Sequence, residues 1–483
     1  MQKLFHKTFS IDYMIDLQLN TGNIVSLTPQ VRKRNRYELV DESNQVQMIL
    51  QLDENHFNVI DYKNVSENKN DLEIKLENLY RKLEKEKNSG IEDEEDENCI
   101  TDPFNSEEIS IDTVKFSMDA CIRRLIQGTI KLNPDFQRQE VWTPDKKSRL
   151  IESLMLKIPI PMFYVSSDEK SYLTVVDGLQ RFSTIRDFIL GKKYLETKKE
   201  EDKGAGFRLQ DLEFWKEYEG KNFKELPINI VNRILETEFT FTIINPRTPE
   251  EVRRNIFKRI NTGGEPLSNQ EIRNALYIGQ ATALLKELAS REEFKKATDY
   301  SVKTGRMEDK ELVLRFVSFL IRDYTVYKKT VNIDTWLSDT MIIVNALPTF
   351  ESKEFQKLSK REFISKEMIT MTDVDAVKVS FGIAMKRAYE LFDKHAFRKS
   401  YPGIRRAPIN KALFETWGVL LSRMNDAGFE KLHSKKVNFF SEYKTLIDDP
   451  QFVLTISRHS MHTASVKSRF EKINDLINRY SND

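Results

Sequence analysis

Cysteine is scarce in this sequence of 483 residues, which has only Cys99 and Cys121. Two isolated thiols provide neither a disulfide framework nor a zinc cluster, and they favour a reducing, intracellular environment. No stretch approaches the roughly 18 apolar residues that a membrane helix needs. The N-terminus has neither the long apolar core nor the small-residue cleavage site of a signal peptide. We therefore expect a cytoplasmic protein that does not contact a membrane.

An excess of either charge sign is also absent. The chain has 76 lysines and arginines against 75 aspartates and glutamates, so its formal net charge is +1. This balance excludes a global attraction to nucleic acid, and any basic surface must be local. The hydrophobic fraction of 39% is enough for a substantial core, and the length indicates about two to four domains. The phosphate-binding pattern G-x-x-x-x-G-K-[ST] is missing as well.

The N-terminal part predicts a small β-rich domain, residues 1–87, that ends in a helix. Short β-like runs come first, for example Val46–Leu52 and Phe57–Tyr62. Over residues 71–87, leucines recur at helical spacing, which predicts an amphipathic helix that packs on its own domain or pairs with another helix. The acidic run Glu92–Glu97 follows. We interpret residues 88–108 as a linker, either a plain spacer or an acidic recognition segment.

Residues 109–278 predict a mixed α/β domain, because strand and helix signals alternate there. The expected helices cover residues 118–127, 144–156 and 180–190, and the expected strands cover 162–165, 172–176 and 238–244. A capping box, Ser268-Asn269-Gln270-Glu271, predicts one further helix start. Residues 279–483 show an almost wholly helical pattern. The predicted fold class is therefore α+β, with a helical C-terminal domain after the mixed core.

The segment Val175–Arg181, reading VVDGLQR, predicts a strand that turns tightly into a helix. Backbone N–H groups at a helix start bind anions, and a glycine lets a phosphate approach the backbone closely. Arg181 would be a misplaced cation in the first helical turn unless an anion binds there. Asp177 could hold Mg²⁺ or orient water, and Gln180 could orient water or contact a base. The alternative is that Asp177 only caps the helix and Arg181 is a surface residue.

Two further motifs carry residues suited to a phosphate. Residues 133–138 read NPDFQR and present Gln137 and Arg138, whose guanidinium can bind a phosphate through two hydrogen bonds. Residues 257–264 read FKRINTGG and contain Arg259 and Asn261 at the end of a helix. Alternatively, the first motif is a solvated turn, and in the second the glycines terminate the helix while Arg259 complements its dipole.

Other chemistry-bearing residues favour structural roles. His459 and His462 are three apart, but no cysteine or acidic cluster nearby completes a zinc site. The tryptophans are interpreted as core or interface anchors; they are Trp142, Trp215, Trp336 and Trp417.

Taken together, the motifs resemble the N-terminal domain of GmrSD-type restriction endonucleases, which belongs to the ParB/sulfiredoxin-like superfamily. The resembling segments read NPDFQRQEVW, SRLIESLMLKIPIPMFYV, VVDGLQRFSTI and IFKRINTGGEPLSNQEIRNAL, within residues 109–278. Two later segments, Arg306–Phe316 and Ile409–Trp417, resemble the helical remainder of short, stand-alone members. No histidine is followed by proline in the His-x-x-Pro spacing of the HNH nuclease domain that the restriction enzymes carry.

The resemblance implies a small ParB/sulfiredoxin-like core and a nucleotide site built on an Asp-Gly-Gln-Gln-Arg motif. Here that motif is Asp177 to Arg181, and Leu179 stands where the family has glutamine. Leucine cannot orient a water molecule, so binding survives this change more readily than hydrolysis. The implied catalytic residues are Asp177, Gln180 and Arg181. The implied nucleotide-binding residues are Gln137, Arg138, Gly178, Arg181, Arg259 and Asn261.

We therefore predict a nucleotide-binding protein, an NTPase or a nucleotide-gated switch, that acts in bacterial anti-phage defence. Its ligand would be a nucleoside triphosphate with Mg²⁺ at Asp177. One alternative is a DNA-binding module, and another is a weak ParB-like nuclease without NTP hydrolysis. A steep loss of affinity with salt would distinguish DNA binding from a compact nucleotide site. A separate effector protein and a second copy of the chain are further expected partners.

Overall fold

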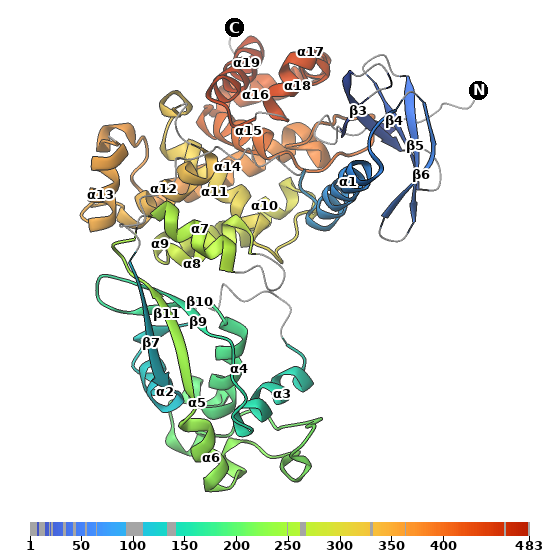
Figure 1. Cartoon of the computed structure of the whole chain (residues 1–483). Helices are drawn as coiled ribbons and strands as arrows, with labels where there is room; N and C mark the ends of the chain where they lie inside the picture. Colours follow the sequence, from blue (N-terminus) through green and yellow to red (C-terminus); the bar gives the residue numbers. More distant parts are fainter. Residues whose placement is uncertain are drawn as a thin grey trace. The chain divides into compact units, whose positions relative to one another are not determined.

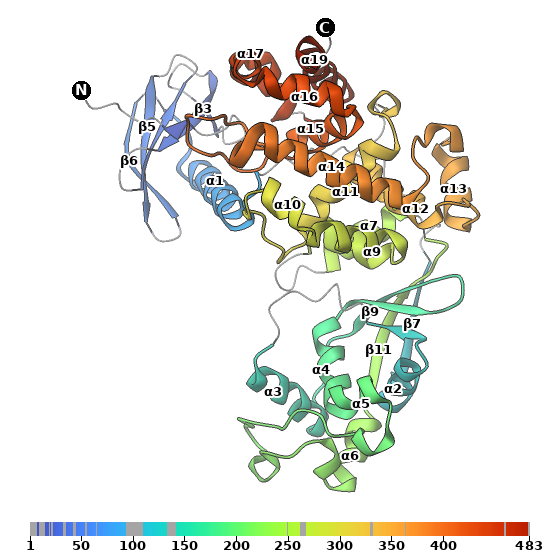
Figure 2. The ribbon, with the colours of Figure 1, turned by 180° about the vertical axis from the view of Figure 1, so that it is seen from behind.

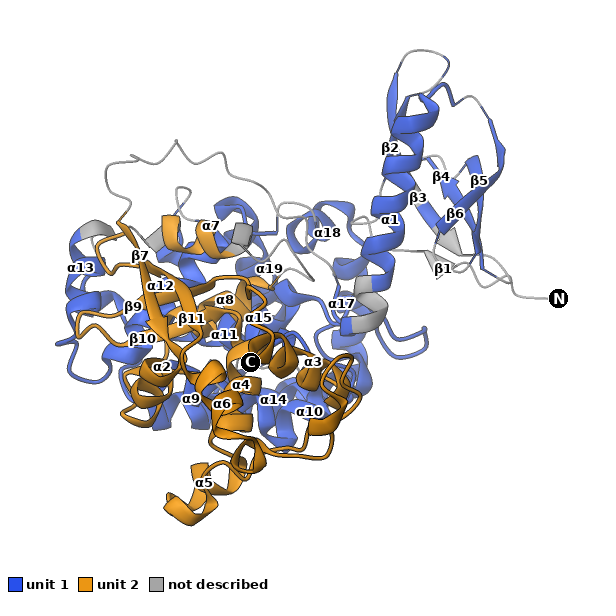
Figure 3. Cartoon of the chain, turned by 60° about the horizontal axis from the view of Figure 1, so that its bottom comes forward, with its two compact units in different colours: residues 1–100, 279–483 blue, residues 101–278 orange. Residues whose placement is uncertain are grey.

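The computed structural model confirms the α+β class, with small sheets and many C-terminal helices. The chain divides into two compact units, Met1–Ile100 with Gly279–Asp483, and Thr101–Ile278 (Figure 3). Among the described helices, none combines the length and apolar character needed to cross a bilayer. The described residues are 7–8, 15–18, 20, 23–31, 35–41, 45–53, 56–63, 65–92, 110–132, 142–248, 250–260, 267–328, 332–362, 364–457 and 460–481.

The first unit begins with an antiparallel sheet covered by one long helix. The strand order is β1-β3-β4-β5-β6, and β2 pairs with β3. Helix α1 lies against this sheet (Figures 1 and 2), and its leucines Leu76 and Leu79 are buried in a cluster with strand residues. The apolar face of the predicted amphipathic helix thus packs against the sheet that precedes it in the chain. The elements are β1 (Lys7–Thr8), β2 (Ile15–Gln18), β3 (Ile24–Val31), β4 (Arg36–Val40), β5 (Val46–Asp53), β6 (His56–Tyr62) and α1 (Lys69–Ser89).

The segment that follows α1 is held by the C-terminal part of the same unit. Ile91 forms a parallel bridge with Ile409. The carboxylate of Glu92 is buried and accepts hydrogen bonds from Lys399 Nζ at 2.9 Å and Asn410 Nδ2 at 2.6 Å. The first residue of the acidic run therefore has two specific partners more than 300 positions away. The rest of that run, from residue 93 onward, lies outside the described residues.

The C-terminal part of the first unit consists of helices packed around large apolar side chains. Trp336 and Trp417 are buried, as predicted for core anchors. Two fully buried charges, Glu415 and Arg469, form an ion pair that compensates their loss of hydration. The helices are α9 (Gln280–Ser290), α10 (Glu292–Ala297), α11 (Glu308–Ile321), α12 (Ile333–Ala346), α13 (Lys353–Glu362), α14 (Val374–Phe392), α15 (Lys411–Arg423), α16 (Asp426–Ser434), α17 (Lys436–Asp448), α18 (Pro450–Ile456) and α19 (Thr463–Ser481).

The second unit contains a mixed five-stranded sheet in the order β7-β11-β9-β10-β8. Its outer pair β7–β11 and the pair β9–β10 are antiparallel, whereas β11–β9 and β10–β8 are parallel. The predicted strand over residues 238–244 is confirmed as β11. The elements are β7 (Ile111–Ser117), α2 (Met118–Ile126), β8 (Ile130–Lys131), α3 (Pro144–Met155), β9 (Phe163–Ser167), β10 (Leu173–Asp177), α4 (Leu179–Ile189), α5 (Lys192–Thr197), α6 (Ile228–Leu235), β11 (Glu238–Ile244), α7 (Glu250–Ile260) and α8 (Asn269–Leu276).

Two apolar clusters in this unit share strand β10. Val175 belongs to the large cluster that includes residues of α3, α4 and α6. The next residue, Val176, belongs to a smaller cluster with Phe257 of α7 and Ile272 of α8. Because successive side chains of a strand point to opposite faces, β10 is anchored on both sides. Asp177, the last residue of β10, therefore starts the next turn from a fixed position.

Candidate functional site

The predicted turn from strand to helix is present at Asp177-Gly178. Strand β10 ends at Asp177, Gly178 is the N-cap residue, and α4 begins at Leu179. The pairing of β10 with β9 shifts register between Val175 and Asp177. Such a bulge redirects side chains and often lies beside a functional site. Here it places Asp177 opposite Tyr164 at the very end of the strand.

Gly178 is required by both its backbone conformation and its surroundings. Its φ angle is +89°, in the left-handed region that other residues rarely adopt. A Cβ atom at this position would overlap the buried ring of Phe163, lying 2.7 Å from its Cε1 atom. The helix start therefore receives no side-chain cap. Asp177 does not cap α4, contrary to the structural alternative considered for it.

Arg181 turns back from α4 onto the strand end. Its Nη2 atom donates to Asp177 Oδ2 at 3.0 Å and to the carbonyl of Met162 at 3.3 Å. Its Nη1 atom donates to the carbonyl of Pro161. The guanidinium carbon lies 4.8 Å from the centre of the Phe163 ring, which adds a cation–π contact. Arg181 is thus an integral part of the turn rather than a surface residue.

The burial of Arg181 has an electrostatic consequence. Its side chain is only 14% exposed, compared with 30% for that of Asp177. Burial lowers the pKa of the Arg181 guanidinium, while the charge and hydrogen bond of Asp177 oppose this shift. The sequence predicted that a cation in the first turn of α4 needs an anion nearby. Within the chain itself, the Asp177 carboxylate provides that anion.

Leu179, the residue that departs from the family motif, points into the protein. It is 6% exposed and belongs to the large apolar cluster of the second unit. Phe182 and Ile185, on the same helix, are buried in that cluster too. Leu179 therefore acts as a core residue that fixes α4 on the sheet. The adjacent Gln180 is partly buried and makes interactions of its own.

Helix α7 brings the third motif to the same strand. Phe257 is the first residue of this motif, and it packs with Val176, which directly precedes Asp177. Arg259 lies two residues further along α7, but its side chain is not among those described. The second motif, with Gln137 and Arg138, also lies outside the described residues, as does Asn261. The implied roles of Arg138 and Arg259 in one nucleotide site with Arg181 therefore stay predictions.

Helix α8 contains a buried polar network that the sequence analysis did not single out. Arg273 Nε donates to Gln270 Oε1 at 2.9 Å, and Gln270 Nε2 donates to Asn274 Oδ1 at 3.1 Å. All of these side chains are buried. The predicted capping box at its start is confirmed, because Ser268 and Glu271 exchange hydrogen bonds with each other's backbone. Polar residues spaced three and four apart were the available signal for this network.

Metal ligands are sparse in the described part of the chain. No group of three or more histidine, cysteine or carboxylate side chains there could hold a metal ion. At the turn, Asp177 supplies a single carboxylate. This suits Mg²⁺, which commonly takes one or two carboxylates and completes its shell with substrate phosphates and water. His459, one of the two histidines considered for a zinc site, lies outside the described residues.

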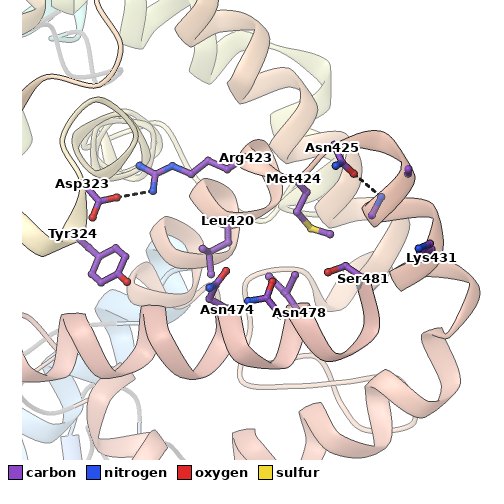
Figure 4. A pocket seen from close by; sticks show the side chains of 13 residues that line it. Asp323, Tyr324, Leu420, Arg423, Met424, Asn425, Lys431, Asn474, Asn478 and Ser481 are labelled. Carbon is purple, nitrogen blue, oxygen red and sulfur yellow. Dashed lines mark hydrogen bonds and ion pairs between the residues drawn. The ribbon is translucent and has the colours of Figure 1, made fainter. Parts of the chain in front are cut away.

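A separate cavity of about 820 Å³ opens in the first unit between α15, α16 and α19 (Figure 4). Polar side chains that line this cavity form ion pairs and helix caps within the protein. Arg423 forms an ion pair with Asp323 at 2.8 Å, and the Asn425 side chain caps α16 by accepting from Gly428 N. No sequence pattern indicates this cavity, because segments from distant parts of the chain meet there.

Comparison with known families concerns the second unit. Residues 122–278 match the family model described as the GmrSD restriction endonuclease, N-terminal domain. No curated protein matches the chain. The matched segment contains β10, the turn at Asp177-Gly178, α4, α7 and α8, which are the elements described above. Residues 122–278 of this chain are therefore similar to the N-terminal domain of the GmrSD restriction endonuclease.

Proposed function

We propose that this protein binds a nucleoside triphosphate at the turn between β10 and α4. A GmrSD N-terminal domain indicates a restriction-type, anti-phage defence context, and a nucleotide-gated switch suits that context. The observation that carries the proposal is the left-handed glycine between a bulged strand end and an uncapped helix start. Helix starts of this kind offer backbone N–H groups and a positive dipole end to a phosphate.

Individual roles follow from the contacts in the turn. Gly178 permits the left-handed backbone at the helix start, where a residue with a Cβ atom would overlap the Phe163 ring. Arg181 supplies a positive charge within the first turn of α4, beside the proposed phosphate position. Asp177 would hold Mg²⁺, which would neutralise part of the phosphate charge. Gln180 would contact the base or a water molecule, and Gln137, Arg138, Arg259 and Asn261 would complete the nucleotide contacts.

Binding is better supported than hydrolysis. An NTPase must position an attacking water, and the residue that departs from the family motif is Leu179, an apolar side chain buried in the core. The groups that support binding, Gly178 and Arg181, lie at the turn itself. We therefore propose nucleotide binding as the main function. Hydrolysis of the bound nucleotide would distinguish an NTPase from a nucleotide-gated switch.

The test measures binding by calorimetry and phosphate release for ATP, GTP, CTP and UTP with Mg²⁺. The variants are Asp177→Ala and, as a matched control, Asp187→Ala in helix α4. Asp187 forms its own ion pair with Arg186 at 2.6 Å, so the control loses the same charge and the same kind of contact. We expect the first variant to bind Mg²⁺–nucleotide at least tenfold more weakly than the second.

The outcomes separate the functional classes. Binding without phosphate release identifies a nucleotide-gated switch, and release that disappears in Asp177→Ala identifies an NTPase. Absence of both binding and release in the wild-type protein rejects the nucleotide proposal. In that case a DNA titration at several salt concentrations tests the DNA-binding alternative, for which affinity must fall steeply with salt.

A further inference from the structure

The Asp177–Arg181 ion pair determines which cation the turn accepts. In the described structure three oxygen atoms converge on one guanidinium, namely Asp177 Oδ2, the Met162 carbonyl and the Pro161 carbonyl. The Phe163 ring covers one side of it. The guanidinium is thus the counter-cation of the only carboxylate assigned to the site. Two of its four contacts come from the backbone that leads into β9, so its position does not depend on Asp177 alone.

A divalent cation that approaches Asp177 meets a carboxylate whose charge is already balanced. The guanidinium and the metal carry charge of the same sign, so the metal must displace Arg181 from Oδ2 or tolerate repulsion at short range. A nucleotide changes this balance, because its phosphates offer Arg181 a new anionic partner. Arginine suits such an exchange, since its planar group binds carboxylate and phosphate with the same geometry.

We infer that Arg181 acts as a latch that keeps free divalent cations from Asp177 and releases this carboxylate only when a nucleotide phosphate engages the guanidinium. The inference rests on the proposed nucleotide function and adds its regulation. Metal and nucleotide then bind with positive coupling, and the metal–nucleotide complex is the true ligand. The carbonyls of Pro161 and Met162 keep the guanidinium beside the site during the exchange, so the ion pair re-forms when the nucleotide leaves.

The experiment uses Mn²⁺ as the metal probe and a non-hydrolysable ATP analogue as the nucleotide, with the full chain. Mn²⁺ affinity is measured by electron paramagnetic resonance, with and without the analogue. In the wild-type protein, which needs no substitution and therefore carries no folding risk, the analogue is expected to tighten Mn²⁺ binding about tenfold or more, within the usual range of coupling between two ligands.

Variants at position 181 test the latch itself. Arg181→Gln removes the charge but keeps donors for the carbonyls, and we expect it to bind Mn²⁺ alone about tenfold more tightly than the wild type. Arg181→Lys keeps the charge and is expected to resemble the wild type. Arg186→Gln is the control for loss of an arginine from the same helix, because Arg186 pairs with Asp187 and not with Asp177. Asp177→Asn is expected to abolish Mn²⁺ binding in both conditions.

The failures of the two proposals are distinguishable. If the analogue binds but Arg181→Gln gains no affinity for Mn²⁺ alone, the latch is wrong and the nucleotide proposal stands. If Arg181→Gln gains Mn²⁺ affinity but no nucleotide binds any variant, the latch between arginine and metal is supported and the nucleotide proposal is wrong. If the wild type binds Mn²⁺ equally with and without bound analogue, the inferred coupling is refuted.

Discussion

Replacement of Gly178 by alanine tests the geometry of the turn most sharply. We expect two separate contributions that lower the free energy of unfolding. The left-handed backbone costs a residue with a Cβ atom about 1–2 kcal/mol. The new methyl group also overlaps the Phe163 ring, and forcing an extra methyl into a packed core costs about 1–3 kcal/mol. The sum predicts a loss of about 2–5 kcal/mol in the free energy of unfolding.

A second glycine in the same unit separates these two costs. Gly128 has a φ angle of +73° and nothing within 4 Å of its missing Cβ atom. Gly128→Ala therefore carries the backbone cost without the overlap. The difference between the two variants isolates the contact with Phe163, about 1–3 kcal/mol. For a unit of this size it corresponds to a difference of about 2–12 °C in melting temperature.

The assay is thermal unfolding of the full chain with each alanine variant, followed by nucleotide titration of the folded proteins. The double variant Gly178→Ala with Phe163→Leu should recover part of the overlap cost, so that the two substitutions are not additive. Gly178→Ala should also weaken nucleotide binding, since the ring it displaces supports the Arg181 guanidinium. Equal destabilisation by Gly178→Ala and Gly128→Ala would show that the close approach of Phe163 is not a property of the folded protein.

Four further substitutions have defined outcomes. The Glu152 carboxylate is buried and accepts hydrogen bonds from the backbone N–H groups of residues 213–215. Burial raises the pKa of this carboxyl group, but the three hydrogen bonds outweigh burial, so that its pKa lies below the usual 4.5. Glu152→Gln should therefore cost about 1–3 kcal/mol near neutral pH, and urea unfolding should show the difference from wild type shrinking as the pH falls below 4.5 through the lowered pKa. Glu92→Ala removes the carboxylate that pairs with the Lys399 amine, so it should lower the free energy of unfolding by about 3–5 kcal/mol. Glu77→Ala breaks the exposed ion pair with Arg81 and should lower it by about 0.5 kcal/mol or less in the same denaturation assay. Leu179→Gln introduces the glutamine of the family motif at a buried position and should lower stability by about 1–3 kcal/mol without producing phosphate release in a colorimetric assay.

The sequence predicted the local elements of the second unit well, since their signals are local. The capping box at Ser268, the strand over residues 238–244 and the turn at Gly178 all depend on neighbours within a few positions. Predicted helix and strand limits there agree with the structure to within one or two residues. The same is true of the helix that follows the N-terminal sheet, whose leucine spacing reflects its contact with that sheet.

The long-range features could not be read from the sequence. Glu92 was grouped with its acidic neighbours, because a charge run is usually solvated, yet its partners Lys399 and Asn410 lie more than 300 residues away. For Arg181, the sequence predicted a bound anion that offsets its unfavourable position in the first turn of the helix. Two of its actual partners, the carbonyls of Pro161 and Met162, belong to the segment that leads into β9. The sequence does not indicate which backbone carbonyls an arginine will contact.

The central claim, that the turn between β10 and α4 binds a nucleotide, is tested most directly by calorimetric titration of Mg²⁺–nucleoside triphosphates into the wild type, Arg181→Ala and Arg186→Ala. Both variants lose one arginine from α4, and only Arg181 contacts Asp177. The account predicts saturable binding by the wild type and by Arg186→Ala, with affinity reduced at least tenfold in Arg181→Ala. Equal affinity in all three proteins, or no binding by the wild type, would contradict it.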